Sequence, residues 1–261
     1  MTFEEIGAKV EAIAEELGLG FGYAPFKHGQ RPKLPYLAFS YPGKKKFACD
    51  NIVLDFNGTI IDDCAYTASI ANEMLTMQGH KTITVEEYKT HFTFPVIKFY
   101  KHVGFKLPPE GNDNFDVLAQ YFIDAYRRDF SKVKVFPDFE RFIKEYKGKK
   151  TLICLSATKQ TELLGQVKMA GVDKHFDHIV GVSDIYAAGK ADVAKNFFSK
   201  THLDPKKTLF IGDTVHDAEV AKELGANIIL VSRGHQSKEV LMKGTDCLIL
   251  DSLEEVKEYI E

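Results

Sequence analysis

The sequence lacks the features that mark several classes of protein. No apolar run is long enough to span a membrane, and the acidic N-terminus, residues 1–5, has no apolar signal segment, so we expect neither a membrane partner nor export. The net charge is −3, which provides no basic surface of the kind that binds nucleic acid. Internal repeats and low-complexity segments are also missing. The 261 residues are enough for one large domain or two small ones.

Cysteine is scarce, and its spacing excludes the usual cysteine-based metal sites. The chain has 4 cysteines that lie far apart: Cys49, Cys64, Cys154 and Cys247. We expect all of them to be reduced thiols, as in a cytoplasmic protein.

The second half of the chain alternates between short apolar runs and helical patterns. The runs predict buried strands at 52–54, 151–155, 179–182, 208–211, 227–231 and 247–250. Helical spacing predicts helices at 138–147, 160–170, 191–200 and 215–224, and a last one capped by Ser252 with Glu255 completing a capping box. This alternation predicts an α/β fold with a doubly wound parallel sheet.

Residues 64–132 interrupt this alternation with helical patterns alone. Thr84 and Glu87 form a predicted capping box, and residues 114–130 form a long amphipathic helix. We therefore expect a helical domain at 64–132, inserted into a core made of residues 47–63 and 133–261.

Residues 1–46 form a predicted α+β extension. We expect a helix at 2–17 and two edge strands at 21–26 and 34–41, followed by a linker rich in lysine. The apolar side chains of this extension must be buried, either on the core or against a second copy of the chain, so a homodimer is one expectation.

The predicted first strand of the sheet ends in a set of polar residues. Asp55 follows the apolar run directly, at the edge where parallel sheets bind ligands. Taken alone, such an aspartate is most often a helix cap or a turn residue. Gly58 and Thr59 favour a ligand-binding role for Asp55, because a glycine lets the backbone approach a phosphate and consecutive amides bind anions.

Three more polar pieces follow predicted strands or begin predicted helices. Ser156 and Ala157 come directly after the strand at 151–155, and Lys190 stands before a helix. Asp213 and Asp217 belong to the run Gly212-Asp-Thr-Val-His-Asp217, in which we interpret His216 as a loop residue and not a ligand. Each piece alone has an ordinary explanation as a cap or a solvated charge.

In this order the four pieces resemble the motifs of the haloacid dehalogenase-like hydrolase superfamily, over about residues 50–256. The branch with an Asp-aromatic-Asn-Gly-Thr first motif, labelled phosphoglycolate-phosphatase-like, is the most similar. The resemblance implies that residues 64–132 are a cap domain. It also implies that Asp55 attacks phosphorus and that Mg²⁺ binds Asp55, the carbonyl of Asn57 and Asp213, with support from Asp217.

The same resemblance implies which groups hold the transferred phosphoryl group: Gly58, Thr59, Ser156, the amide of Ala157, and Lys190. The expected function is that of a Mg²⁺-dependent phosphohydrolase acting on a small phosphorylated metabolite. Asn57 departs from the usual pattern, which has an aspartate there as general acid and base. We expect slow turnover unless Asp62 or Asp63 stands in for it.

Two alternative functions remain open from the sequence. A phosphonate-cleaving enzyme of this superfamily also lacks the second aspartate and would use a cap lysine as a Schiff base, for which the candidates are Lys81, Lys89, Lys98 and Lys101. A protein that binds a phosphorylated ligand or a partner, with catalysis lost, is the other.

Overall fold

The computed structural model describes residue 12 and residues 20–22, 38–40, 46–106, 114–183 and 189–261, in two compact units, 1–46 and 47–261. In the first unit, β1 (Gly20–Gly22) and β2 (Ala38–Ser40) pair antiparallel, with Phe21 opposite Phe39. The helix predicted at 2–17 lies outside the described residues except at Ala12, which is helical.

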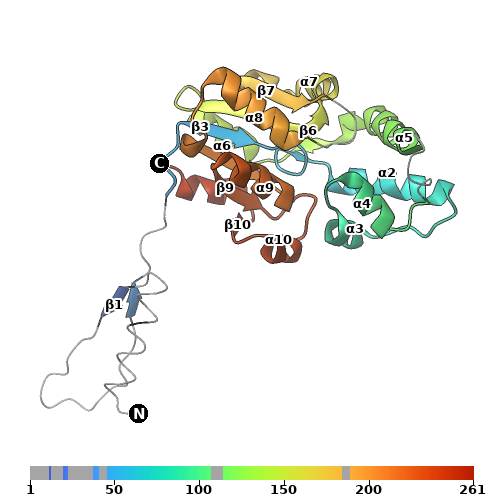
Figure 1. The fold of residues 1–261 in the computed structure, drawn as a ribbon, viewed down its shortest axis with the longest axis horizontal. Coiled ribbons are helices and arrows are strands. Elements are labelled where there is room, and N and C mark those ends of the chain that lie inside the picture. The colour runs from blue at the N-terminus through green and yellow to red at the C-terminus, as the bar shows by residue number, and fades with distance from the viewer. Residues whose placement is uncertain (1–11, 13–19, 23–37, 41–45, 107–113, 184–188) are drawn as a thin grey trace, which may run out of the picture. The chain divides into compact units, whose positions relative to one another are not determined.

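A six-stranded sheet with the order β10-β9-β8-β3-β6-β7 forms the centre of the second unit (Figure 1). All of its neighbouring strands are parallel, which confirms the α/β prediction. The strands are β3 (Asn51–Leu54), β6 (Thr151–Lys159), β7 (His178–Val182), β8 (Thr208–Gly212), β9 (Asn227–Val231) and β10 (Leu248–Leu250).

The strands are apolar on both faces because helices cover both faces. Ile52 and Leu54 belong to one apolar cluster and Val53 to another, as the twofold alternation of a strand requires. The first cluster includes α6 (Phe139–Tyr146), α7 (Gln160–Met169) and α11 (Leu253–Val256), and the second includes α8 (Lys190–Thr201) and α9 (Val215–Leu224).

Strand β6 is longer than the sequence predicts. It continues through Lys159, so Ser156 and Ala157 lie within it and not after it. Its pairing with β7 shifts register between Leu155 and Lys159, and this irregularity turns the polar end of the strand away from regular pairing. The prediction stopped at Leu155 because the apolar run stops there.

Four helices follow β3 and lie together near the end of the sheet toward which β3 points (Figure 1). They are α2 (Cys64–Met77), α3 (Val85–His91), α4 (Val96–His102) and α5 (Asn114–Arg128). The capping box of Thr84 and Glu87 is present, as predicted. A 3₁₀ turn, η1 (Phe130–Lys132), follows α5.

A short antiparallel pair of strands, which the sequence did not predict, joins the two ends of this helical segment. Strand β4 (Ile61–Asp62) lies just before α2 and pairs antiparallel with β5 (Lys134–Val135), just after η1. Strands of two residues are too short to show a periodic pattern. This pair of strands brings the beginning and the end of the helical segment together.

Two smaller features near the C-terminus also differ from the prediction. Helix α10 (Lys238–Gly244) was not predicted. Ser252 caps α11, but the Glu255 carboxylate accepts a hydrogen bond from the amide of Asp251 and not of Ser252, so the predicted capping box is not formed. Among the described residues, no helix is both long and apolar enough to cross a bilayer.

Candidate active site

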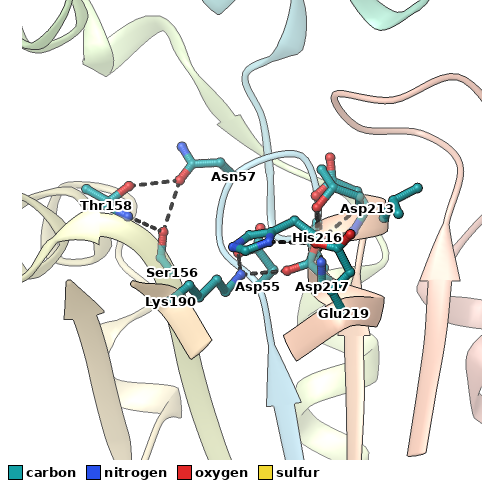
Figure 2. A network of polar contacts seen from close by, with 12 residues as sticks. Asp55, Asn57, Ser156, Thr158, Lys190, Asp213, His216, Asp217 and Glu219 are labelled. Carbon is teal, nitrogen blue, oxygen red and sulfur yellow. Dashed lines mark hydrogen bonds and ion pairs between the residues drawn. The ribbon is translucent and has the colours of Figure 1, made fainter. Parts of the chain in front are cut away.

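The carboxyl ends of the central strands bring together residues that are far apart in the sequence. Asp55 follows β3, Asp213 follows β8, and Asp217 lies in the first turn of α9. One carboxylate oxygen from each lies within 4.8 Å of the others. Figure 2 shows Lys190, from the N-terminus of α8, directed at Asp55 and Asp217.

Charge in this cluster is unbalanced. Lys190 is 3% exposed, and its ammonium contacts Asp55 and lies 2.6 Å from Asp217 Oδ1. Burial raises the pKa of Asp55 well above its usual range and the pKa of Asp213 to about 6, despite nearby positive charges. Burial also opposes the ionisation of Asp217, but Lys190 outweighs it and lowers the pKa of Asp217. One lysine thus leaves three buried carboxylates short of positive charge.

Local backbone structure explains the position of Asp217. Thr214 is the N-cap of α9, and its side chain accepts a hydrogen bond from the amide of Asp217. In return Asp217 Oδ2 accepts from the amide of Thr214 at 3.0 Å and from its hydroxyl at 2.6 Å. This capping box leaves Asp217 Oδ1 for Lys190, so the start of the helix orients the carboxylate.

Two glycines allow the backbone to pack closely around Asp213. Gly58 has φ +71°, and a Cβ there would lie 2.3 Å from Asp213 Oδ2; one at Gly234 would lie 2.0 Å from the same oxygen. The hydroxyl of Thr59 lies 3.4 Å from Asp213 Oδ1, and the amide of His235 donates to Asp213 Oδ2 at 2.5 Å. Asp213 therefore has a fixed orientation toward the cluster.

The side chain of Asn57 lies among hydrogen-bonding groups on two sides. Its Nδ2 donates to Asp63 Oδ2 at 2.8 Å and to the hydroxyl of Tyr126 at 2.9 Å. Its Oδ1 accepts from the hydroxyls of Thr158 at 3.1 Å and Ser156 at 3.4 Å, as Figure 2 shows. Both ends of the amide are thus hydrogen-bonded: the NH₂ group donates toward a carboxylate, and the carbonyl oxygen accepts from two hydroxyls.

Asp63 and His235 form a buried ion pair that our reading of the sequence did not identify. His235 Nε2 lies 3.1 Å from Asp63 Oδ1, and its Nδ1 lies 2.9 Å from the hydroxyl of Tyr88 on α3. Burial opposes the charge of His235, but Asp63 outweighs it and raises the pKa of His235 to about 9. His235 follows the glycine that packs on Asp213, in the run Arg233-Gly-His, and that run was the only signal for it in the sequence.

Of the two aspartates proposed as stand-ins for the missing acid, only Asp63 lies in the site. Asp62 is exposed in β4, whereas Asp63 is 1% exposed. The oxygens of Asp63 accept hydrogen bonds from Asn57, the amide of Gly58 and Tyr126, in addition to the contact with His235. These bonds lower the pKa of Asp63 against the effect of burial, so its carboxylate is held ionised.

A cavity of about 190 Å³ lies over this cluster. The predicted site residues that line it are Asp55, Asn57, Ser156, Ala157, Lys190, Asp213 and Asp217. Gly58 and Thr59 do not line it, because the amide of Gly58 donates to Asp63 at 2.8 Å and the hydroxyl of Thr59 faces Asp213. The opposite wall comes from α2 to α5.

His216 is helical and not a loop residue, since α9 begins at Val215. Its ring stacks on Phe94, with the ring centroids 4.8 Å apart, and its Nδ1 lies 3.2 Å from Glu219. The first turn of α9 therefore also supports the segment before α4.

Comparison with known proteins identifies the class of this molecule. Residues 52–231 match the family model of haloacid dehalogenase-like hydrolases, and the chain belongs to that family. It is a hydrolase whose relatives are phosphatases of the phosphoglycolate-phosphatase-like branch.

Two such relatives show the extent of the similarity. A phosphoglycolate phosphatase from Pseudomonas fluorescens is 24% identical over 213 residues, covering 77% of this chain and 76% of the relative. One from Vibrio vulnificus is 21% identical over 216 residues, covering 80% of this chain and 95% of the relative.

Solved structures have the same fold. A predicted phosphatase from Clostridium acetobutylicum superimposes with a TM-score of 0.68 at 19% identity, covering 80% of this chain and 96% of that one. A haloacid dehalogenase-like family protein from Streptococcus pneumoniae gives 0.64 at 19% identity, covering 81% and 98%.

Proposed function

We propose that this protein is a Mg²⁺-dependent phosphohydrolase that cleaves a small phosphomonoester through an aspartyl-phosphate on Asp55. The observation that carries the proposal is the cluster of Asp55, Asp213 and Asp217 around Lys190, at the edge of a parallel sheet and beside a cavity. A nucleophile, a cation and a place for a hard metal ion are thus within reach of one phosphoryl group.

The residues present fit a magnesium ion. Three carboxylates offer hard oxygen ligands, and the single positive charge of Lys190, which pairs with Asp55 and Asp217, cannot offset all three. We assign the ion to Asp55, Asp213 and the backbone carbonyl of Asn57, with Asp217 in support. When bound, Mg²⁺ would offset the repulsion between the nucleophile and the phosphate.

The residues of the chain divide the remaining work. Asp55 Oδ attacks phosphorus and the bond from phosphorus to the alcohol oxygen breaks, and that oxygen takes its proton from water because no side chain at position 57 can supply one. A water molecule later attacks the aspartyl-phosphate, which releases inorganic phosphate and restores the carboxylate. Ser156, the amide of Ala157 and Lys190 line the cavity where they can bind phosphoryl oxygens. Gly58 and Thr59 serve the site indirectly, through Asp63 and Asp213.

The helical segment 64–132 acts in this proposal as a cap that excludes bulk water. Tyr88 and Tyr126 attach it to His235 and Asp63, close to the nucleophile.

The four cysteines are all free thiols, which supports a reducing compartment such as the cytoplasm.

The structure argues against the phosphonate-cleaving alternative. Such an enzyme needs a lysine from the cap in the cavity, and none of Lys81, Lys89, Lys98 and Lys101 is among its lining residues. Borohydride treatment with a phosphonoaldehyde should therefore trap no adduct.

Turnover of phosphate esters tests the proposal directly. The purified protein should hydrolyse 4-nitrophenyl phosphate with Mg²⁺, and EDTA or Asp55→Asn should abolish the activity. Asp62→Asn, an exposed change of the same kind, should keep it. Full activity in EDTA, or in Asp55→Asn, would sink the proposal, and so would the absence of turnover in the wild type.

A further inference from the structure

The wall of the cavity opposite the catalytic cluster is uncharged. The residues of α2 to α5 and their connections that line it, within the described ranges 64–106 and 114–130, are all neutral: Thr67, Ala71, Tyr88, Phe92, Phe94, Val96, Phe99, Tyr100, Ala119, Phe122, Ile123 and Tyr126. Of the hydroxyls in this set, those of Tyr88 and Tyr126 already bond His235 and Asp63, whereas the buried hydroxyl of Thr67 has no hydrogen-bond partner among the described residues. This wall therefore offers mainly aromatic and aliphatic surface, with the hydroxyl of Thr67 as a neutral polar group and no counter-ion.

Four of the wall residues are phenylalanines. Phe92 packs edge-on against Phe94 and Phe99, with ring centroids 5.4 and 5.7 Å away, and Phe122 approaches from α5. Phe92, Phe94 and Phe122 are only partly buried, so part of each ring is open to an occupant. Burial of an apolar group against such rings is favourable, whereas a carboxylate there would lose its hydration without gaining a counter-ion.

The cations that line the cavity belong to its other side. Lys190 is paired with Asp55 and Asp217, and His235 is paired with Asp63. Lys159, at the end of β6, is the remaining one among the described lining residues, and Glu162 from the next turn lines the cavity beside it. Glu162 is paired with Arg127, whose guanidinium donates to both of its carboxylate oxygens at 2.5 and 2.7 Å, so Glu162 is not the partner of Lys159. Lys159 belongs to the sheet side of the cavity with Lys190 and His235, which leaves the described part of the wall formed by α2 to α5 without a counter-ion.

We infer that the substrate is the phosphate monoester of a compact, uncharged and largely apolar alcohol, whose carbon skeleton packs against Phe92, Phe94, Phe99 and Phe122. This inference rests on the proposed phosphohydrolase function and adds the class of substrate. A cavity of about 190 Å³ is small beside the sites of drug-sized ligands, which measure about 300–1,000 Å³, and fits an alcohol of a few carbon atoms. A carboxylated substrate such as phosphoglycolate is the contrasting prediction from the relatives' names.

A pair of isosteric esters tests the inference. In 2-methylpropyl phosphate an isopropyl group occupies the position of the carboxylate in phosphoglycolate, and the two alcohols are leaving groups of similar quality. With Mg²⁺ at neutral pH, kcat/KM should be higher for 2-methylpropyl phosphate by about tenfold or more. Equal values, or a preference for phosphoglycolate, would overturn the inference.

A cation placed in the wall should reverse the preference. Phe122→Lys should shift the ratio of the two kcat/KM values toward phosphoglycolate by about tenfold. Val117→Lys, on the same helix but 64% exposed and outside this cavity, should leave the ratio unchanged. If Phe122→Lys does not fold, Phe94→Lys makes the same test from the segment before α4. An unshifted ratio in a folded wall variant would count against the inference.

Two outcomes separate this inference from the proposed function. Turnover of 4-nitrophenyl phosphate together with a preference for phosphoglycolate that Lys159→Met removes would identify Lys159 as a carboxylate anchor and overturn only the substrate class. Failure to hydrolyse any of the three esters would overturn the proposed function, and this inference with it.

Discussion

At the scale of the residue, the partners of Asn57 change the meaning of that substitution. A missing aspartate suggests a damaged enzyme, since general acid and base catalysis is worth about 10²–10⁴-fold. The structure shows instead that the amide donates to the carboxylate of Asp63 at 2.8 Å and accepts from Thr158. A carboxylate at position 57 would face that of Asp63 directly. The site is built around an amide.

Asn57→Asp should therefore not restore activity. We expect no rise in kcat on alkyl phosphates and a loss of about 1–3 kcal/mol in the free energy of unfolding, because a half-buried carboxylate at position 57 would face the buried carboxylate of Asp63, which loses the hydrogen bond from the amide. Asn57→Asp combined with Asp63→Asn exchanges the two groups and should recover part of this loss. Urea unfolding and steady-state kinetics provide the measurements. A tenfold rise in kcat for the single variant would restore the missing-acid interpretation.

His235 makes stability depend on pH. Its pKa in the folded protein is about 9, above the ordinary value of 6.5, so its pairing with Asp63 contributes full stability below about pH 6.5. That contribution is lost as pH rises from 6.5 through 9, and it amounts to at most on the order of 3 kcal/mol.

Urea unfolding of the metal-free protein should show this loss. The wild type should exceed His235→Gln in stability at pH 6.5, and the difference should narrow by pH 9.5. A difference that stays constant over this range would mean that His235 is neutral in the folded protein.

At the scale of the element, α5 is joined to the loop that follows Asp55. The hydroxyl of Tyr126 donates to Asp63 Oδ2 at 2.6 Å and accepts from Asn57. The antiparallel pair of β4 and β5 joins the two ends of the same helical segment. The helices are thus attached to the site by a side chain as well as by the backbone.

Tyr126→Phe should weaken this attachment. Removing the hydroxyl leaves Asp63 and Asn57 each short of a partner, so we expect a loss of about 1–3 kcal/mol in the free energy of unfolding and a lower kcat. Tyr121→Phe is the matched control, because Tyr121 lies on the same helix and donates to Glu73 Oε1 at 2.6 Å, away from the cavity. Equal kcat values for the two variants would show that the link has no part in catalysis.

At the scale of the whole molecule, binding of Mg²⁺ should raise the free energy of unfolding and the Tm. An ion present at a hundredfold excess over its Kd adds about 2.7 kcal/mol, which for a unit of this size raises Tm by roughly 5–10 °C. The rise should be lost in Asp213→Asn and kept in Asp62→Asn. Differential scanning calorimetry with and without EDTA measures it, and an equal rise in both variants would place the ion elsewhere.

The division of the chain into two units predicts what truncation does. A chain that begins at Lys45 retains Phe47, whose amide donates to the carbonyl of Tyr259 at 2.7 Å, and it should keep its Tm and its activity. A chain that begins at Asp50 loses this pairing with the C-terminus and should be less stable. Aggregation of the longer of these two chains would show that the N-terminal unit has a structural role.

The sequence by itself determined the parallel sheet and the place of the acidic cluster. Apolar runs such as Ile52–Leu54 and Thr208–Ile211 are long enough to show burial on both faces, and an aspartate follows each at the strand end. The apolar runs are local signals, so the strands can be recognised without knowledge of the fold, whereas the aspartates were assigned to one site through the resemblance of the four pieces to known motifs.

Only the tertiary structure decided which residues contact one another in the site and which substrate groups its cavity can accept. His235 meets Asp63 across 172 positions of sequence, and Tyr126 meets Asn57 across 69. The uncharged wall of the cavity comes from the four helices α2 to α5 and the segment between α3 and α4, whose apolar residues are spaced as in an ordinary core. The period of a helix shows which side chains are buried, but the packing of one helix against another decides whether they enclose a core or a binding site.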